Sequence, residues 1–327
     1  DAMLWRPEGT CHTLRGHEST VAGIRFFPLG DRVLTWDVDR TAIIWNATSC
    51  SALRTLVFDV DVECASVTHQ ERVVTCSEGG ECALWDTSRF EQIGVPTVRG
   101  VWGLELFPSG TRVLSWGRVP VAWVWDGTTG EVTCELRGHA AAIDVGRVFP
   151  DEERVLTGSR DGKAIIWDLR SCAPLHVYRH SDWVIDAVVL AGGRSIAALS
   201  LPEGLVVWSG DLGERWRMRV ASRPEEPGDL SALAAFPAGD RLILWGLRAP
   251  AVLIVDAATG ALLHRLAHSS SFLYEAVVAP AGDIVVACGS GGVTVWDAMS
   301  GAQLHQLPLS CSSIDLAVGS AVDPRGF

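Results

Sequence analysis

The histidine, serine and aspartate residues of this chain could in principle support hydrolysis or metal binding, but their spacing does not favour either. No Gly-x-Ser-x-Gly elbow places a serine nucleophile at a strand-to-helix turn. The Gly-Ser-Gly-Gly run from Gly289 to Gly292 has no following Lys, which favours a hairpin turn over a phosphate-binding loop. The acidic residues lack the alternating ligand spacing of a calcium loop. We therefore expect no catalytic residue, no cofactor and no metal site.

The nine cysteines are also not spaced for metal or redox chemistry, because no Cys-x-x-Cys pair occurs. Cys76, Cys82 and Cys288 lie in apolar runs, where we expect free thiols that pack as small hydrophobic groups. No signal-peptide pattern opens the chain, and no apolar run approaches the ~18 residues of a membrane helix. These features predict an intracellular, cytoplasmic protein that does not insert into a membrane.

The formal net charge of -12 bears on the partners of the chain. Nucleic-acid backbones and anionic membranes would be repelled, so nucleic acid is not expected as a partner. A basic protein surface or peptide would be attracted. Lys163 is the only lysine, and the other basic residues are arginines, for which a coding bias is the simpler explanation.

The elements that position all of these residues come from an internal repeat. Short apolar runs that end in Trp recur at intervals of 40 to 47 residues, and Val255 replaces Trp in one copy. The aligned positions are Trp5, Trp45, Trp85, Trp125, Trp167, Trp208, Val255 and Trp296. An apolar-Pro-x-Gly turn signal precedes most copies, for example at Pro28 and Pro237. Each period therefore predicts four short antiparallel strands, and such sheets bury their faces by packing against one another, as in a β-propeller.

The chain resembles the WD40 repeat family over essentially its whole length. A His lies 28 residues before the Trp in four copies, at His17, His139, His180 and His268. The resemblance implies a buried hydrogen-bonded tetrad of His, Ser/Thr, Asp and Trp. Two blades match it fully, through His17, Thr35, Asp39 and Trp45 and through His139, Thr157, Asp161 and Trp167. The other blades depart from the pattern.

We predict an all-β, WD40-type propeller that forms a single domain over residues 1–327. Seven complete blades are expected, at about residues 18–56, 60–96, 99–136, 140–178, 182–219, 229–266 and 271–307. Residues 1–17 and 310–327 are left over as closing strands, and we expect them to form a composite eighth blade. A closed seven-blade ring is the alternative. Because the chain begins with Asp1, we expect it to be part of a longer protein.

Candidate binding residues lie in the loop before each first strand and in the turn between the second and third strands. The family resemblance implies that these loops form a channel-mouth face that receives partners. Trp183 and Trp102 are candidate aromatic contacts there. Asp59, Asp61, Glu63, Glu78 and Glu81 would form an acidic group that attracts a basic partner. The insertion at residues 215–229 could dock another domain of the same parent chain.

The resemblance and the lack of catalytic spacing together predict a non-catalytic scaffold that binds protein or peptide partners on the channel-mouth face. The alternative is a permanent structural subunit of a large assembly of cytoskeletal, ciliary or trafficking type.

Overall fold

The described part of the chain comprises most of the strands and turns. The structure is a computed structural model and describes residues 2–5, 11–37, 40–59, 61–68, 71–77, 79–89, 91–94, 98–200, 204–209, 214–218, 230–249, 251–268 and 272–307. These residues divide into two compact units, one within 1–115 and 123–133, the other within 116–122 and 134–318.

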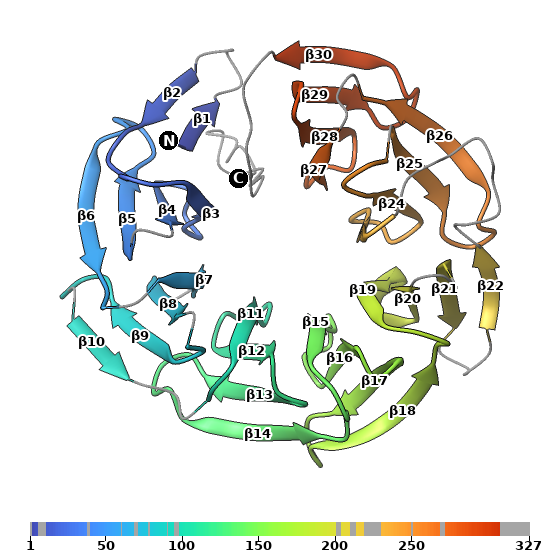
Figure 1. The fold of residues 1–327 in the computed structure, drawn as a ribbon, viewed down its shortest axis with the longest axis horizontal. Helices are drawn as coiled ribbons and strands as arrows, with labels where there is room; N and C mark the ends of the chain where they lie inside the picture. Colours follow the sequence, from blue (N-terminus) through green and yellow to red (C-terminus); the bar gives the residue numbers. More distant parts are fainter. Residues whose placement is uncertain are drawn as a thin grey trace, which may run out of the picture. The chain divides into compact units, whose positions relative to one another are not determined.

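Seven four-stranded antiparallel sheets follow one another along the chain, each with its strands in sequence order (Figure 1). This confirms the predicted all-β propeller with seven complete blades. Blade 1 comprises β3 (Val21–Phe26), β4 (Arg32–Asp37), β5 (Thr41–Asn46) and β6 (Ala52–Val57). Blade 2 comprises β7 (Val62–Val67), β8 (Arg72–Ser77), β9 (Cys82–Asp86) and β10 (Glu91–Gly94). Blade 3 comprises β11 (Val101–Leu106), β12 (Arg112–Gly117), β13 (Val121–Asp126) and β14 (Val132–Arg137).

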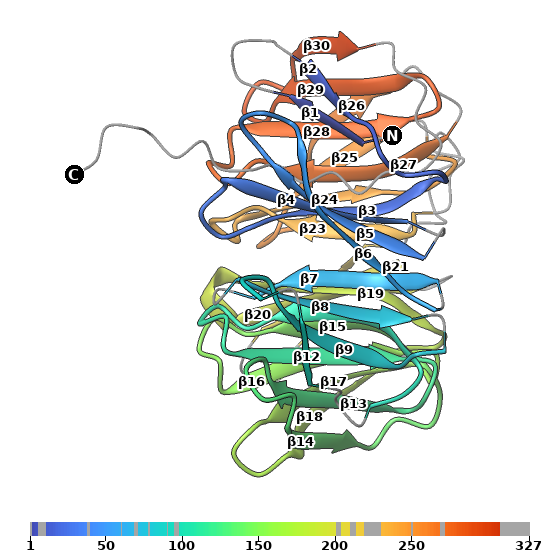
Figure 2. The same cartoon turned by 90° about the vertical axis from the view of Figure 1, so that its left-hand side faces the viewer.

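Blades 4 to 7 repeat the same four-strand plan, and Figure 2 shows the strands from the side. Blade 4 comprises β15 (Ile143–Val148), β16 (Arg154–Ser159), β17 (Lys163–Asp168) and β18 (Ala173–Arg179). Blade 5 comprises β19 (Val184–Leu190), the 3-10 turn η1 (Ala191–Gly193), β20 (Ser195–Ser200), β21 (Gly204–Ser209) and β22 (Glu214–Met218). Blade 6 comprises β23 (Ala232–Ala235), β24 (Arg241–Trp245), β25 (Ala251–Asp256) and β26 (Leu262–Ala267). Blade 7 comprises β27 (Leu273–Val278), β28 (Ile284–Gly289), β29 (Gly292–Asp297) and β30 (Gln303–Leu307).

The two middle strands of a blade are buried on both faces, whereas the fourth strand is largely exposed. In β17, the residues from Ala164 to Trp167 are all buried, while most residues of β18 are exposed. The middle strands are therefore continuous apolar runs, as expected for strands covered by a sheet on each side. The turn between the first two strands uses the expected Pro-Gly chemistry: Gly30 has a φ of 70° and donates its N–H to the Phe27 carbonyl at 2.8 Å.

The apolar core lies between neighbouring blades. Val145 and Phe149 of blade 4 pack in one cluster with Ala187 and Ile196 of blade 5. Three tryptophans at equivalent positions (Trp36, Trp116 and Trp245) are buried, with at most 8% of their surface exposed. Trp36 packs with blade 2 residues and Trp245 with blade 7 residues. The tryptophan surplus of the sequence thus fills the spaces between sheets.

The start of the chain forms a two-stranded antiparallel sheet of β1 (Ala2–Trp5) and β2 (Cys11–Leu14). Leu4 and Leu14 are buried and pack with Val33, Ile43 and Trp45 of blade 1. Residues 310–327, the other half of the predicted composite blade, lie outside the described residues. The composite eighth blade therefore stays a prediction.

The described elements also bear on membrane insertion. None of the helical segments among them has the length and apolar character needed to cross a bilayer.

Candidate functional site

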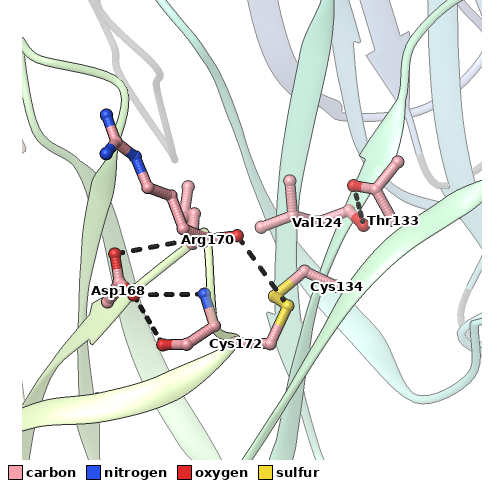
Figure 3. The surroundings of a disulfide bond; sticks show 8 residues. Val124, Thr133, Cys134, Asp168, Arg170 and Cys172 are labelled. Atoms are coloured by element: carbon pink, nitrogen blue, oxygen red, sulfur yellow. Dashed lines mark hydrogen bonds between the residues drawn. A yellow bond between two sulfur atoms is a disulfide. The ribbon is translucent and has the colours of Figure 1, made fainter.

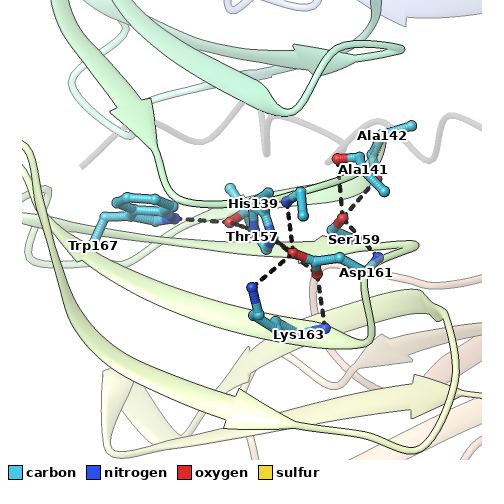
Figure 4. A network of polar contacts seen from close by, with 9 residues as sticks. His139, Ala141, Ala142, Thr157, Ser159, Asp161, Lys163 and Trp167 are labelled. Carbon is cyan, nitrogen blue, oxygen red and sulfur yellow. Dashed lines mark hydrogen bonds and ion pairs between the residues drawn. The ribbon is translucent and has the colours of Figure 1, made fainter.

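The Trp167 network of blade 4 joins four side chains from two strands and two loops (Figure 4). The indole Nε1 of Trp167 donates a hydrogen bond to Thr157 Oγ1 at 2.8 Å. The Nε2 atom of His139 lies 2.7 Å from the same hydroxyl, and its Nδ1 atom lies 3.1 Å from Asp161 Oδ1. Because the indole can only donate, the Thr157 hydroxyl is free to donate to His139 Nε2, which leaves the proton of the neutral ring on Nδ1 facing Asp161.

The protonation states of this network follow from burial and hydrogen bonding. Burial lowers the pKa of His139 and outweighs the neighbouring Asp161 carboxylate, so the neutral ring is favoured. Burial opposes ionisation of Asp161, but hydrogen bonds led by the Ala140 N–H lower its pKa overall. Lys163 Nζ lies 3.2 Å from the same carboxylate. This is a satisfied, rigid arrangement, typical of a structural network.

The Trp45 network of blade 1 includes an acidic residue, Asp37, that the sequence pattern did not indicate. His17 Nε2 lies 2.6 Å from Thr35 Oγ1, which accepts the Trp45 indole N–H at 2.7 Å. His17 Nδ1 lies 2.8 Å from an Asp37 carboxylate oxygen, and Asp37 is fully buried. Asp39, the residue assigned from the sequence, lies outside the described residues. Asp37 ends β4, and its position at the strand end is the signal that could have identified it.

Blades 2 and 3, which lack a tetrad histidine, keep the tryptophan-to-hydroxyl bond. The Trp85 indole donates to Thr75 at 2.9 Å, and the Trp125 indole donates to Ser115 at 3.1 Å. In blade 5, His180 instead lies edge-on to Trp208, with ring centroids 4.9 Å apart. The tryptophan positions therefore stay anchored where the rest of the pattern is lost.

Trp183 is the exposed aromatic residue of the loop that precedes β19, with 51% of its surface accessible. The Arg160 guanidinium lies over its ring, 5.1 Å from the centroid, and forms a two-pronged ion pair with Asp144 at 2.9–3.1 Å. The backbone N–H of Trp183 is bound by the Asp182 carboxylate at 2.7 Å. The turn around Gly162 packs against this loop, since the Gly162 carbonyl accepts the His180 N–H at 2.8 Å. Trp183 is thus held in place with much of its side chain open to solvent.

The acidic group and Trp102 lie in the other compact unit. Asp59, Glu63 and Glu81 are exposed and Asp61 is partly exposed, whereas Glu78 lies outside the described residues. Gly80 positions the turn before Glu81: its φ is 76°, and a Cβ there would lie 2.1 Å from the Gly100 nitrogen. Trp102 is only partly exposed and is the second residue of β11. Of the insertion, residues 219–229 lie outside the described part of the chain.

A repeated arginine contact was missed in the sequence analysis. In four blades an Arg five residues after the turn Phe lies over that ring, with distances from its Cζ atom to the ring centroid of 3.9–4.4 Å, at Arg32–Phe27, Arg112–Phe107, Arg154–Phe149 and Arg241–Phe236. Several of these guanidinium groups also reach the next blade. Arg241 donates to the Ala298 carbonyl at 2.9 Å and to the Gly282 carbonyl at 3.3 Å. The shared Phe-Pro spacing of the Arg is the signal that could have revealed it.

Asp186 links the first strands of three blades. Its carboxylate accepts hydrogen bonds from Arg147 of β15 at 3.0 Å and from the Leu233 N–H of β23 at 2.9 Å. Burial raises the pKa of Asp186, against the opposing effect of Arg147. No sequence motif predicted this interblade contact.

The cysteines differ from the expectation of free thiols. Cys76 and Cys82 face each other across β8 and β9 and form a disulfide, and Cys134 and Cys172 form another (Figure 3). Cys288 is buried and does not form a disulfide, as expected. The expectation failed for Cys76 and Cys82 because strand register, rather than sequence spacing, brings them together.

Within the part of the chain that the structure describes, no group of three His, Cys, Asp or Glu residues is arranged to hold a metal ion.

Comparison with known proteins identifies related sequences. The family model described as "WD domain, G-beta repeat" matches residues 9–46 and 130–168. Cilia- and flagella-associated protein 52 of Sus scrofa is 26% identical over 160 residues, which cover 47% of this chain and 26% of that protein. The aligned region thus spans about a quarter of that relative. Angio-associated migratory cell protein of Homo sapiens is 24% identical, with 90% of this chain and 72% of that protein covered.

A solved structure shares the fold. The crystal structure of the computationally designed Ika8 protein matches with a TM-score of 0.76 and 17% sequence identity, and the match covers 91% of both chains. At this identity the likeness concerns the fold alone.

Proposed function

Because this chain belongs to the WD40-repeat β-propeller family, we propose that it is a non-catalytic interaction scaffold that binds protein or peptide partners on its channel-mouth face. The family model, the seven blades and the WD-repeat relatives support the general role. Propellers of this family generally act as scaffolds without catalysis. The half-exposed side chain of Trp183 is the observation that supports binding on this face.

Trp183 is suited to binding because its side chain is half exposed while its loop is hydrogen-bonded to the neighbouring turn. A half-exposed indole offers a large contact area, and its loop is held by Asp182 and by the Gly162 turn. A side chain already fixed in place loses little conformational entropy when a partner binds. Tryptophan is also enriched among the residues that dominate binding energy.

The acidic group supports a basic partner. Asp59, Asp61, Glu63 and Glu81 lie at or near the surface of a chain whose net charge is -12. Such a surface attracts a basic protein or peptide and repels nucleic acid and anionic membranes. We propose Trp102 as a second residue that contacts the partner. Another domain of the parent chain is a further candidate partner, through the 215–229 insertion.

A permanent structural subunit is the second candidate function. One observation favours it: the relative from Sus scrofa is named a cilia- and flagella-associated protein. The same name supports an intracellular place for this chain, for which we propose the cytoplasm. In this case the chain would occur only within a high-mass complex.

The test is a comparative pull-down from an extract of the source cells, quantified by mass spectrometry. We expect the Trp183→Ala variant to lose most of a partner that the wild-type chain captures. Leu175→Ala is the matched control, because Leu175 is 47% exposed and lies on the outer strand β18. A capture pattern that is the same for all three proteins would contradict binding through Trp183.

The acidic group is tested separately by reversing Asp59, Asp61, Glu63 and Glu81 to Lys. Glu91→Lys with Glu131→Lys is the control, since both residues are exposed and lie on the same compact unit. We expect loss of a basic partner only in the first variant. If every partner stays bound, the acidic group has no role in recognition.

A further inference from the structure

The two disulfides of the described chain lie in contrasting surroundings. Cys76 and Cys82 belong to neighbouring strands of one blade, and each has only 1% of its surface exposed. Cys134 lies on β14 of blade 3, and Cys172 lies in the turn before β18 of blade 4. Cys134 is 4% exposed, but Cys172 is partly exposed. The second disulfide therefore joins two blades, and one of its two residues is partly exposed.

Cys172 stands at a turn position that three other blades fill with glycine and that blade 1 fills with Cys50. The turn between the third and fourth strands has Gly130, Gly260 and Gly301 at this position in blades 3, 6 and 7, all with positive φ. Cys172 adopts the same left-handed conformation, with a φ of 54°. A residue with a Cβ is less stable than glycine in this conformation. Cys50 has the same conformation, with a φ of 58°, and is not in a disulfide, so this turn accommodates cysteine with or without a disulfide partner.

The Cys134–Cys172 bond fixes the edge of blade 3 to blade 4. The fourth strand of a blade has no strand neighbour on its outer side, so its backbone is exposed to opening from that edge. Around the bond, the Thr133 hydroxyl donates to the Val124 carbonyl at 3.0 Å and the Ser171 N–H donates to Asp168 at 3.1 Å (Figure 3). The disulfide is the covalent link in this otherwise hydrogen-bonded region.

We propose that Cys134–Cys172 is a thiol-exchange site whose natural reactants are small thiols or dithiols, and that the buried Cys76–Cys82 bond reacts far more slowly. The thiolate of the reactant attacks the sulfur of Cys172, the more exposed of the two residues, and forms a mixed disulfide. The old sulfur–sulfur bond breaks, and Cys134 leaves with its electron pair and takes a proton from water. The second thiol of a dithiol then attacks the mixed disulfide. The products are the oxidised dithiol and two protein thiols, at Cys134 and Cys172.

The consequence of exchange is a looser outer seam between blades 3 and 4. In the oxidised chain, β14 is tied to the turn before β18, so the two cannot separate. After reduction only non-covalent contacts hold that seam. The state of the bond would therefore respond to the thiol balance of the compartment and would alter the mobility of one edge of the propeller.

The first test measures how readily each bond is reduced in the folded protein. The purified oxidised chain is treated with graded dithiothreitol under native conditions, quenched with iodoacetamide and mapped by peptide mass spectrometry. We expect Cys134 and Cys172 to be alkylated roughly tenfold or more faster than Cys76 and Cys82, because attack requires access to a sulfur. Reduction of both pairs at the same rate would overturn the proposal, as would alkylation of Cys134 and Cys172 without any reductant.

The second test measures the seam by hydrogen–deuterium exchange. Reduction of the wild-type chain should raise exchange in residues 132–137 and 169–173 and leave blade 7 unchanged. Cys172→Gly is the matched variant, because glycine suits the left-handed turn and removes the bond without straining the backbone. It should exchange like the reduced wild type under oxidising and reducing conditions alike. If exchange in these segments is unchanged both by reduction and by Cys172→Gly, the bond does not restrain the seam and the proposal fails.

Discussion

Thr157 is the residue on which the blade 4 network converges, since its hydroxyl contacts both the Trp167 indole and the His139 ring. Replacing it by the similarly shaped Val leaves two buried polar groups without their partner. We expect Thr157→Val to lower the free energy of unfolding by about 2–4 kcal/mol. Urea denaturation measures this. The exposed Thr55→Val serves as the control and should stay within about 0.5 kcal/mol of wild type; equal effects of the two substitutions would refute a special role for Thr157.

His139 makes the stability of the fold depend on pH at the residue scale. Its pKa is lowered by burial, so the unfolded chain binds this proton more readily than the folded chain. The stability that His139 contributes is present above its ordinary pKa of 6.5 and is lost as the pH falls through the lowered value. Asp161, whose pKa is also lowered, adds a loss of the same sign at more acidic pH.

The prediction is that acidification from pH 7.5 to 5 destabilises the wild-type chain more than the His139→Gln variant. His268 has a lowered pKa for the same first cause, burial, and therefore contributes the same trend in both proteins. Thermal unfolding followed by circular dichroism at each pH gives the comparison. Parallel pH curves for the two proteins would mean that His139 does not titrate on unfolding.

At the scale of elements, the arginine that follows the Phe-Pro turn connects three blades to the next one, through Arg32, Arg154 and Arg241. The Arg241 guanidinium covers Phe236 and donates to two carbonyls of blade 7 at once. Lysine cannot reproduce this planar fork. We expect Arg241→Lys to cost about 1–2 kcal/mol of unfolding free energy, measured in urea. Arg137→Lys, at a side chain 68% exposed, should cost almost nothing, and a similar loss at both sites would argue against the interblade contact.

The strands could be predicted from the sequence because their motifs repeat. Contacts that depend on the register between paired strands could not. The Trp spacing and the Phe-Pro-x-Gly turns recur in phase, so seven four-stranded sheets could be derived from them. The Cys76–Cys82 pair could not, because it depends on which residues face one another across a strand pair. Cys134 and Cys172 are 38 residues apart, and only the packing of two blades brings them together.

The candidate site was predicted in part for the same reason. Trp183 is half exposed, and its place after His180 in the repeat indicated the loop. The support of its ring by Arg160 and Asp144 was not predictable, since those residues belong to the neighbouring blade. The arginine excess looked like coding bias, although at least four arginines make equivalent contacts with phenylalanine.

At the scale of the whole molecule, the prediction of a single domain remains to be tested. Within the described residues, the chain passes between the two compact units at residues 115–116, 122–123 and 133–134, all within blade 3. Neither unit therefore contains a complete set of strands for that blade. We expect calorimetry to record one unfolding transition for residues 1–327. Two separated transitions, each matched by a stable proteolytic fragment, would contradict a single domain.

The central claim for the whole molecule is that it binds a protein partner through the face that carries Trp183. The most direct measurement is the Kd of a captured partner for the wild-type chain and for Trp183→Ala, by surface plasmon resonance, with Leu175→Ala as the control. The account predicts that Trp183→Ala weakens binding by about tenfold or more, as for a tryptophan at the centre of an interface, while Leu175→Ala binds like wild type. An unchanged Kd for Trp183→Ala, with its fold intact by circular dichroism, would contradict the account.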